Sequence, residues 1–492
     1  MLFNSAEYLL VLLPAAFIAY FLLGSAGLGG AAKLWLVLVS LFFYGWWNPT
    51  YLGLLGLSIV VNFWLGTRLI ATATTDTTAG SKLLTLGLAF NLGLLAWFKY
   101  AGFAVESANF LLGIQLPAPN VVLPLAVSFF TFTQLAYLVD CRRNLAREYS
   151  FPNYVLFVTF FPHLIAGPIL HHREMMPQFE SRKNLLPRSN NIAIGLSLIS
   201  MGLFKKVVVA DTFSVWASAG FDQSSSLSLF EAWISSLSYT FQLYFDFSGY
   251  TDIALGSALL FNIRLPINFN SPYKARNIRD FWRRWHMTLS RFLRDYLYVP
   301  LGGNRRGTAR VIANLMITFV LGGLWHGASW MFVIWGALHG AAMIAHRAWT
   351  QLGIGLPRWL GWLITFNFVN LAWVFFRARD MADAKRVLEG MAGINGVVLP
   401  PAFGDWLPQL KSLGISFGPI LRTGNDAFQM VLWMVGAFVI VLAFRNSNQL
   451  APFTGEARAI GPGRAILCGL MASASLVGIL ASKYSEFIYF NF

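Results

Sequence analysis

Charged residues are scarce in this chain of 492 residues. They make up 12% of the sequence, whereas soluble domains carry about 25%. Hydrophobic residues make up 57% of the chain, and the mean hydropathy is +0.59. The composition therefore argues against a water-soluble fold and favours an integral membrane protein.

Cysteine is nearly absent, and the two cysteines predict neither a disulfide framework nor a metal site. Cys141 and Cys468 lie far apart in the sequence and lack metal-ligand spacing. His163, His171 and His172 surround a proline-rich turn, but we identify no carboxylate or cysteine partners for a metal there. We therefore expect no bound metal and no bound cofactor.

The sequence also lacks the short motifs of several common enzyme classes. No P-loop, dinucleotide-binding fingerprint or GxSxG nucleophile elbow is present. ATPase, oxidoreductase and hydrolase functions therefore lose their usual support from sequence.

No long polar block or linker divides the chain, so residues 1–492 are predicted to form one membrane domain. Apolar runs long enough to cross about 30 Å of hydrocarbon recur throughout it, and we expect about eleven crossings. The first run lacks a basic leader, which indicates a retained helix and not a secretory signal. Two runs, 121–139 and 153–170, contain internal proline, and the second also contains glycine, which predicts broken or re-entrant helices. The clearest runs are residues 8–23, 33–47, 51–67, 83–98, 192–210, 232–247, 311–345, 359–376, 428–444 and 464–482.

The net charge of +15 comes from basic residues in short loops between apolar runs. There they bias topology and meet anionic lipid headgroups, so we expect membrane lipids and no nucleic acid as partners. Residues 264–310 hold eleven Lys and Arg against two Asp, which predicts a basic, amphipathic cytoplasmic segment. Residues 377–427 are rich in Gly and Pro, and we expect an extramembrane loop with one short helix near 382–391.

Within the basic segment, residues 280–298 place apolar side chains at spacings of three and four. This periodicity predicts a helix on or in the membrane surface. The helix would present His286 beside Arg283 and Arg284. Such guanidinium groups suit either the phosphates of a nucleotide-bearing donor or lipid headgroups, and both interpretations stay open.

The run 311–345 contains no charged residue, yet it holds His326 and His339. At 35 residues it is too long for one ordinary span. The glycines of GGLWHG, residues 322–327, predict two helical pieces that meet there. A titratable side chain at such a break is a functional candidate by default, because it is costly to place in hydrocarbon.

Two roles are open for His326 at this stage. A desolvated imidazole is neutral and can accept a proton, which suits a general base. Alternatively, the ring hydrogen-bonds a neighbouring helix and holds the bundle together. For His339 we favour the structural role. For Asp246 and Asp252, within YFDFSGYTD at 244–252, we expect structural pairing with a basic side chain or a Tyr hydroxyl.

Taken together, seven stretches of the sequence resemble the membrane-bound O-acyltransferase family, and in particular the bacterial branch with the alginate O-acetyltransferase membrane subunit. They occur in the family's order and cover most of the chain. The stretches are SFFTFTQLAYLVDCRR (128–143), FFPHLIAGPI (160–169), YTFQLYFDFSGYTDIALG (239–256), NFNSPYKARNIRDFWRRWHMTLSRFLRDYLYVPLGG (268–303), GGLWHGASW (322–330), WVFFRARD (373–380) and FIYFNF (487–492).

The resemblance implies an all-α polytopic fold, a ring of about eleven tilted transmembrane helices, some re-entrant or broken, around a central funnel or tunnel. It implies that His326 is the signature catalytic residue and that His286 is the second catalytic site. We add Arg283, Arg284, Trp325 and Asn314 as expected substrate-binding residues. Backbone amides near Gly322 and Gly323, or Asn314, would stabilise the oxyanion.

The resemblance also implies an activity. Relatives in this branch move acetyl groups from a cytoplasmic donor, acetyl-CoA in our expectation, toward exported polysaccharide such as alginate or cellulose. They act directly or through a periplasmic acetyltransferase partner, which places the chain in a bacterial inner membrane. Alternatives are D-alanyl transfer to teichoic acid, a transporter built on the broken helix, and a non-catalytic scaffold for export.

Overall fold

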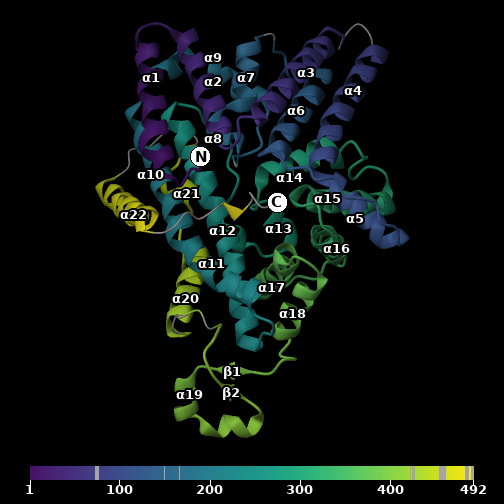
Figure 1. Cartoon of the computed structure of the whole chain (residues 1–492), viewed down its shortest axis with the longest axis vertical. Coiled ribbons are helices and arrows are strands. Elements are labelled where there is room, and N and C mark those ends of the chain that lie inside the picture. The colour runs from purple at the N-terminus through teal and green to yellow at the C-terminus, as the bar shows by residue number, and fades with distance from the viewer. Residues whose placement is uncertain are drawn as a thin grey trace. The chain divides into compact units, whose positions relative to one another are not determined.

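The computed structural model describes residues 1–72, 77–148, 150–165, 167–421, 423, 427–453, 461–481 and 487–488. Of the terminal FIYFNF stretch, residues 489–492 lie outside this description. In the described chain the only strands are β1 (Val398–Leu399) and β2 (Ser416–Phe417), which pair in parallel. The predicted all-α fold is therefore confirmed (Figure 1).

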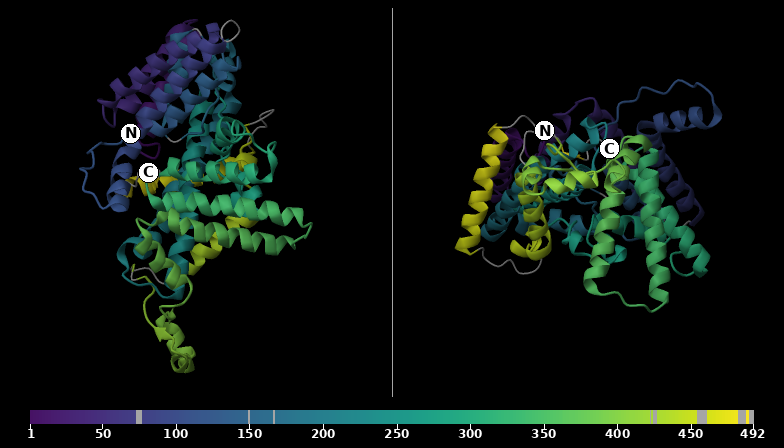
Figure 2. Two further views of the ribbon diagram at one scale, coloured as in Figure 1. Left: turned by 90° about the vertical axis from the view of Figure 1, so that its right-hand side faces the viewer. Right: turned by 90° about the horizontal axis from the view of Figure 1, so that it is seen from below.

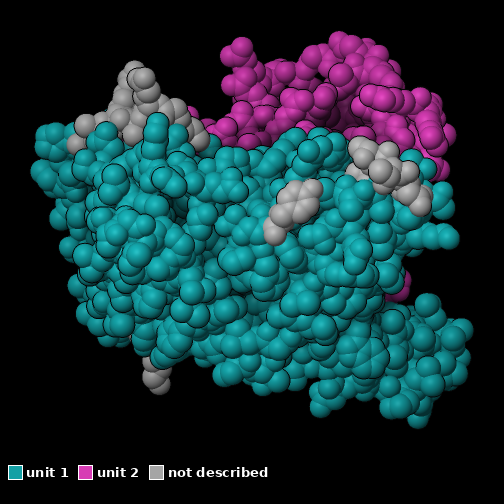
Figure 3. Space-filling view, turned by 90° about the horizontal axis from the view of Figure 1, so that it is seen from above, with its two compact units in different colours: residues 1–203, 250–267, 451–491 teal, residues 204–249, 268–450, 492 magenta. Residues whose placement is uncertain are grey.

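The chain divides into two compact units, coloured separately in Figure 3. Unit 1 comprises Met1–Leu203, Tyr250–Ile267 and the described residues from Ala451 onward. Amide side chains of Asn62 and Asn91 exchange hydrogen bonds of 3.1 and 2.6 Å between two of its helices. Its elements are η1 (Glu7–Leu12), α1 (Leu13–Ser25), α2 (Gly29–Gly45), α3 (Tyr51–Thr72), α4 (Thr77–Leu95), η2 (Ala96–Tyr100), α5 (Ala101–Leu112), α6 (Val127–Arg142), α7 (Phe151–Thr159), α8 (Phe161–Leu164), α9 (His172–Glu180), η3 (Arg182–Leu185), α10 (Ser189–Leu203) and α22 (Pro462–Ala481).

Unit 2 comprises Phe204–Gly249 and Asn268–Leu450. The long helix α12 (Leu229–Leu260) begins in unit 2 and ends in unit 1. The other elements of unit 2 are η4 (Phe204–Ala210), α11 (Asp211–Ser218), η5 (Ala219–Gln223), η6 (Pro272–Lys274), α13 (Ile278–Trp282), α14 (Met287–Leu293), η7 (Arg294–Tyr298), α15 (Gly307–His326), α16 (Trp330–Gln351), α17 (Arg358–Arg377), α18 (Met381–Met391), β1, α19 (Pro401–Trp406), η8 (Pro408–Leu413), β2, α20 (Ala427–Ala443) and α21 (Ser447–Leu450).

Seven helical segments of the described chain are long and apolar enough to cross a membrane. Helices α2 and α20 are apolar but shorter. The polytopic membrane fold is thus confirmed, and the count of about eleven crossings stays a prediction. The seven segments are Glu7–Ser25, Tyr51–Thr72, Thr77–Leu112, Ser189–Gln223, Gly307–His326, Arg358–Arg377 and Pro462–Ala481.

Two expected interruptions are present in unit 1. The run 153–170 breaks at Phe160, between α7 and α8. In the run 121–139, α6 starts only at Val127, after Ala126 with a φ of 59°. Both runs are therefore broken, as the proline in each run predicted.

Helices α15 and α16 form a hairpin, seen running side by side in the left view of Figure 2. The expected break lies directly after His326, and the Ser329 side chain caps α16 by accepting from the Met331 N–H at 3.2 Å. A Cβ on Gly323 would collide with the Phe332 carbonyl oxygen, and one on Gly336 would collide with that of Phe319. The two helices can lie this close only because glycine occupies these positions.

The helix predicted over 280–298 is not continuous, which corrects the sequence interpretation. α13 ends at Trp282, a turn follows, and α14 starts at Met287. The turn is held by backbone bonds to a neighbouring strand-like segment: Asn270 N–H donates to Arg284 O and Met287 N–H to Asn268 O, both at 2.9 Å. These tertiary bonds replace the hydrogen bonds that would continue the helix.

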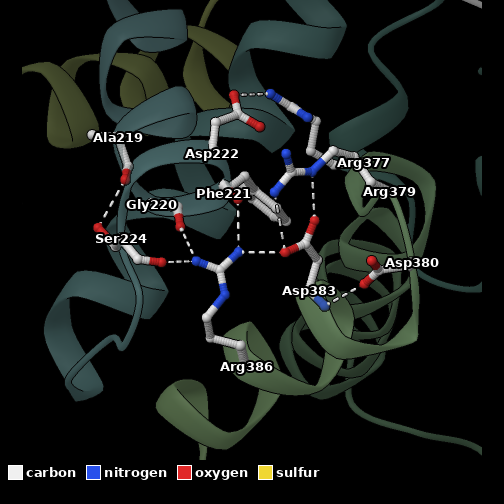
Figure 4. Close-up of polar contacts among 10 residues, drawn as sticks. All are labelled: Ala219, Gly220, Phe221, Asp222, Ser224, Arg377, Arg379, Asp380, Asp383 and Arg386. Atoms are coloured by element: carbon white, nitrogen blue, oxygen red, sulfur yellow. Dashed lines mark hydrogen bonds and ion pairs between the residues drawn. The ribbon is translucent and has the colours of Figure 1, made fainter.

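The loop 377–427 contains the expected short helix as α18, together with β1, α19, η8 and β2. The segment from β1 to β2 projects beyond the helices of unit 2 (Figures 1 and 2). The Arg386 side chain attaches α18 to η5, because it donates to the Gly220, Phe221 and Ser224 carbonyls and pairs with Asp383 at 2.8 Å (Figure 4). Asp383 also pairs with Arg379 at 2.7 Å.

Candidate active site

His326 is the last residue of α15 and lies in an aromatic cluster of unit 2. Only 3% of its surface is exposed. The centroids of the Trp325, Trp335 and Phe376 rings lie 5.0, 5.2 and 5.2 Å from that of its imidazole. The aromatic rings shield His326 from solvent on several sides.

His286 lies next to this cluster. The centroids of the two imidazole rings are 6.2 Å apart, and His286 is 6.0 Å from the Trp325 ring. On another side, the Phe247 ring packs edge-on against His286 at 4.9 Å. The structure therefore brings together His286, His326 and Trp325, three of the residues singled out from sequence.

The backbone of His286 explains how a side chain between arginines becomes buried. His286 adopts a left-handed conformation with φ of 41° and ψ of 54°. Such a conformation is uncommon outside glycine and often marks functional sites. It turns Trp285 and His286 inward, both with 0% exposure, while Arg283 stays exposed.

A small polar network holds the His286 ring. Its Nδ1 lies 3.1 Å from Asn268 Oδ1. The backbone N–H and the hydroxyl of Thr288 donate to the same oxygen, at 3.2 and 2.9 Å. His286 lies outside the seven candidate spans, and burial lowers the pKa of its imidazole to about 3. The ring is therefore neutral at physiological pH.

A cavity of about 200 Å³ opens beside His326. It follows one face of α15 from Leu315 to His326, a distance of about 16 Å at 1.5 Å per residue. Arg294 and Tyr298 of η7 contribute polar groups, and the other walls are mostly apolar. The lining residues are Trp282, Leu289, Ser290, Leu293, Arg294, Tyr298, Leu315, Thr318, Phe319, Gly322, His326, Trp335 and Met343.

Arg283 and Arg284, both expected to bind substrate, do not line this cavity. Arg283 is exposed, while Arg284 pairs with Asp280 at 2.8 Å. The guanidinium at the cavity belongs to Arg294, which sequence reasoning did not single out. The sequence did offer one signal for Arg294: it lies eight residues, or about two helical turns, after His286 in the periodic stretch 280–298.

Asn314 lies away from the imidazole pair. Its amide donates to the carbonyls of Leu301 and Gly303, at 3.3 and 3.2 Å, and holds the turn that precedes α15. It precedes His326 by about 18 Å along the helix at 1.5 Å per residue. At this distance the Asn314 side chain does not lie beside His326, where the expected oxyanion role would require it.

The remaining polar candidates have structural partners. His339 Nδ1 accepts from the Trp282 indole N–H at 3.2 Å, in line with the structural role favoured for it. Asp246 pairs with Lys206 at 2.8 Å, and Lys206 also pairs with Asp211 at 2.8 Å. The expected ion pair of Asp246 is therefore confirmed.

The histidines near the proline-rich turn have partners that sequence reasoning missed. His171 lies 3.8 Å from Asp140, and His172 lies 3.5 Å from Glu148. His163 Nε2 lies 2.9 Å from the Phe157 carbonyl. Among the residues with described positions, no group of three His, Cys, Asp or Glu side chains could hold a metal ion.

Comparisons with known proteins agree with the motifs. The chain is 44% identical to the peptidoglycan O-acetyltransferase of Helicobacter pylori, over 100% of this chain and 98% of that protein. It is 35% identical to the probable alginate O-acetylase AlgI of Azotobacter vinelandii, over the full length of both chains. The teichoic acid D-alanyltransferase of Streptococcus thermophilus is more distant, at 29% identity over 51% of this chain and 68% of that protein.

A family match covers the part of the chain that contains both imidazoles. Residues 41–379 match the membrane-bound O-acyltransferase family. With relatives of this similarity along the whole chain, the expected family and the expected enzyme class are both confirmed. The chain belongs to the membrane-bound O-acyltransferase family and is an O-acyltransferase.

Proposed function

We propose that this enzyme transfers acetyl groups from a cytoplasmic thioester donor toward an exported polysaccharide. The observation that carries the proposal is the imidazole pair at 6.2 Å, with His326 at one end of an elongated cavity. Arg294 and Tyr298 of the basic segment also line that cavity. By the positive-inside rule this segment faces the cytoplasm of a bacterial inner membrane.

Acetyl-CoA suits the cavity as donor. The mostly apolar walls suit the pantetheine arm of such a donor. The Ser290 hydroxyl has no hydrogen-bond partner in the described structure and offers a contact for one of its amides. Arg294 at the cavity, which also pairs with Asp295 at 2.7 Å, and the exposed Arg283 of the same basic segment favour the phosphates of the nucleotide end. The thioester would then reach His326.

The chemistry requires a base and no group beyond the two substrates. His326 takes the proton of the acceptor hydroxyl while that oxygen attacks the acetyl carbonyl carbon. The new C–O bond forms, the C–S bond breaks, and the leaving thiolate takes up the proton. A positioned base contributes a factor of about 10² to 10⁴ to such a step.

The names of the relatives favour a cell-wall glycan as the acceptor. The Helicobacter pylori relative is named for peptidoglycan and is more similar to this chain than the Azotobacter vinelandii relative, which is named for alginate. The acetyl group reaches the glycan directly or through a periplasmic acetyltransferase. Acetylation of alginate or cellulose is the alternative, and D-alanyl transfer ranks lower because the relative named for it matches about half of this chain.

Two measurements test the proposal. The purified enzyme in proteoliposomes should transfer labelled acetyl groups from acetyl-CoA without net solute flux, whereas flux without transfer would support a transporter.

In cells, mass analysis should show that peptidoglycan from a strain without the gene has lost O-acetyl groups that the strain with the gene carries. Unchanged peptidoglycan with deacetylated exopolysaccharide would assign the acceptor to the exopolysaccharide.

A further inference from the structure

Asn268 is the centre of the polar network around His286. One of its partners, the backbone N–H of Thr288, is always a hydrogen-bond donor and therefore fixes the orientation of the Asn268 amide. The Thr288 backbone N–H can only donate, and it points to Asn268 Oδ1 at 3.2 Å. The atom facing Thr288 and His286 is therefore the amide oxygen, and a flipped amide would place two donors against each other.

The orientation of Asn268 determines the tautomer of His286. An amide oxygen can only accept, so His286 Nδ1, at 3.1 Å from it, must carry the proton. In a neutral imidazole the other nitrogen then presents a lone pair. The described structure gives His286 Nε2 no hydrogen-bond partner, although the ring is fully buried beside His326.

We infer that Asn268 is a positioning residue that holds His286 in the Nδ1–H tautomer, so that its Nε2 acts as an acceptor in the reaction. This assignment rests on the proposed acetyl transfer. It decides whether His286 accepts a proton or hydrogen bond in that reaction or donates one to the oxyanion. Nε2 then accepts a hydrogen bond or a proton, either from the hydroxyl of the glycan substrate or from protonated His326. It cannot donate to the oxyanion.

The local backbone supports a dedicated positioning role. Asn268 O accepts from Met287 N–H at 2.9 Å, so residue 268 holds the backbone directly after the left-handed His286 as well as the His286 ring. The Asn268 side chain is fully buried, with 0% exposure. Its amide Nδ2 has no partner in the described structure, so the side chain is held by its oxygen alone.

Three variants separate positioning from mere packing. Asn268→Ala removes the acceptor, and we expect kcat to fall about 10- to 100-fold, as for other orienting partners of histidine. Asn268→Asp keeps an acceptor and adds a charge that favours the imidazolium, so activity should persist near neutral pH while the acidic limb of the kcat profile moves to higher pH. Thr288→Val removes one donor to Asn268 Oδ1 but keeps the backbone N–H, so we expect a smaller fall in kcat than in Asn268→Ala.

Asn270→Ala is the matched control, because Asn270 is exposed in the same segment and its side chain accepts from Asn446. It should leave kcat and the pH profile unchanged. Full kcat in Asn268→Ala, or an unshifted profile in an active Asn268→Asp, would overturn the inference.

A readout that needs no activity keeps the inference separate from the proposed function. The chain has 7 histidines, so the ¹⁵N signals of His286 in reconstituted protein can be assigned by their loss in His286→Gln. We expect a protonated Nδ1 and an unprotonated Nε2, and a change of this pattern in Asn268→Ala. An unprotonated Nδ1 would refute the inference even if acetyl transfer is confirmed.

Discussion

The imidazoles of His286 and His326 lie 6.2 Å apart, although one belongs to a turn in the basic segment and the other ends a helix. Each ring is buried in aromatic side chains. If the reaction takes place at this pair as proposed, the aromatic side chains would limit access of bulk water and favour acyl transfer to a sugar hydroxyl over thioester hydrolysis.

His326→Ala should lower acetyl transfer by about 10² to 10⁴ without affecting membrane insertion, because it removes the proposed base. Initial rates with labelled acetyl-CoA, compared at equal amounts of folded protein, measure the loss. His346→Ala is the control, since His346 is a partly exposed residue on α16 that does not line the cavity. Wild-type activity in His326→Ala would refute the catalytic role.

Arg294→Ala should raise the KM for acetyl-CoA several-fold and leave kcat nearly unchanged, because the role proposed for Arg294 is to bind the donor far from the reacting carbon. Steady-state kinetics at low and high salt check this, and the difference should shrink as salt screens the phosphates. The parallel variant Arg283→Ala should have a smaller effect, since Arg283 does not line the cavity. A larger rise in KM for Arg283→Ala than for Arg294→Ala would instead support the substrate-binding role that the sequence predicted for Arg283.

Gly336→Leu should destabilise the α15–α16 hairpin by about 1–3 kcal/mol or more, the usual cost of overpacking. A Cβ at Gly336 meets the Phe319 carbonyl, whereas one at Gly436 on α20 meets open space. Thermal unfolding of the detergent-solubilised protein should therefore show a lower Tm for Gly336→Leu than for Gly436→Leu. Equal values would contradict the close packing.

Acid should weaken the attachment of α18. Hydrogen bonding from Arg379, together with the charges of Arg379 and Arg386, holds the pKa of Asp383 below its ordinary value. A carboxyl with a lowered pKa stabilises the fold above the unfolded-state pKa of about 4, and this stabilisation is lost as pH falls through the native value. Asp383→Asn should therefore flatten the acid side of a Tm-against-pH curve, unlike the control Asp405→Asn.

Local signals in the sequence predicted part of this structure correctly. The glycines of GGLWHG predicted the break after His326, because a hairpin this tight needs residues without side chains. The short helix found as α18 was expected near 382–391. Both features depend on residues that are close together in the chain, so they can be predicted from a single sequence.

Features that depend on distant residues were missed. The periodicity of 280–298 is compatible with a continuous helix, and only the backbone bonds to Asn268 and Asn270 interrupt it. That turn reorients the chain, so Arg294 and not Arg283 or Arg284 reaches the cavity. Asn268 was not singled out either, because an asparagine in a loop has no distinctive spacing.

The bonds that shape the His286 turn all lie between residues 268 and 288, upstream of the α15–α16 hairpin. During synthesis, all the residues that make these bonds leave the ribosome before α15 does. The second imidazole arrives only when α15 packs into place. A chain truncated before α15 thus carries one imidazole of the pair, and under the proposed mechanism it would not consume the thioester donor.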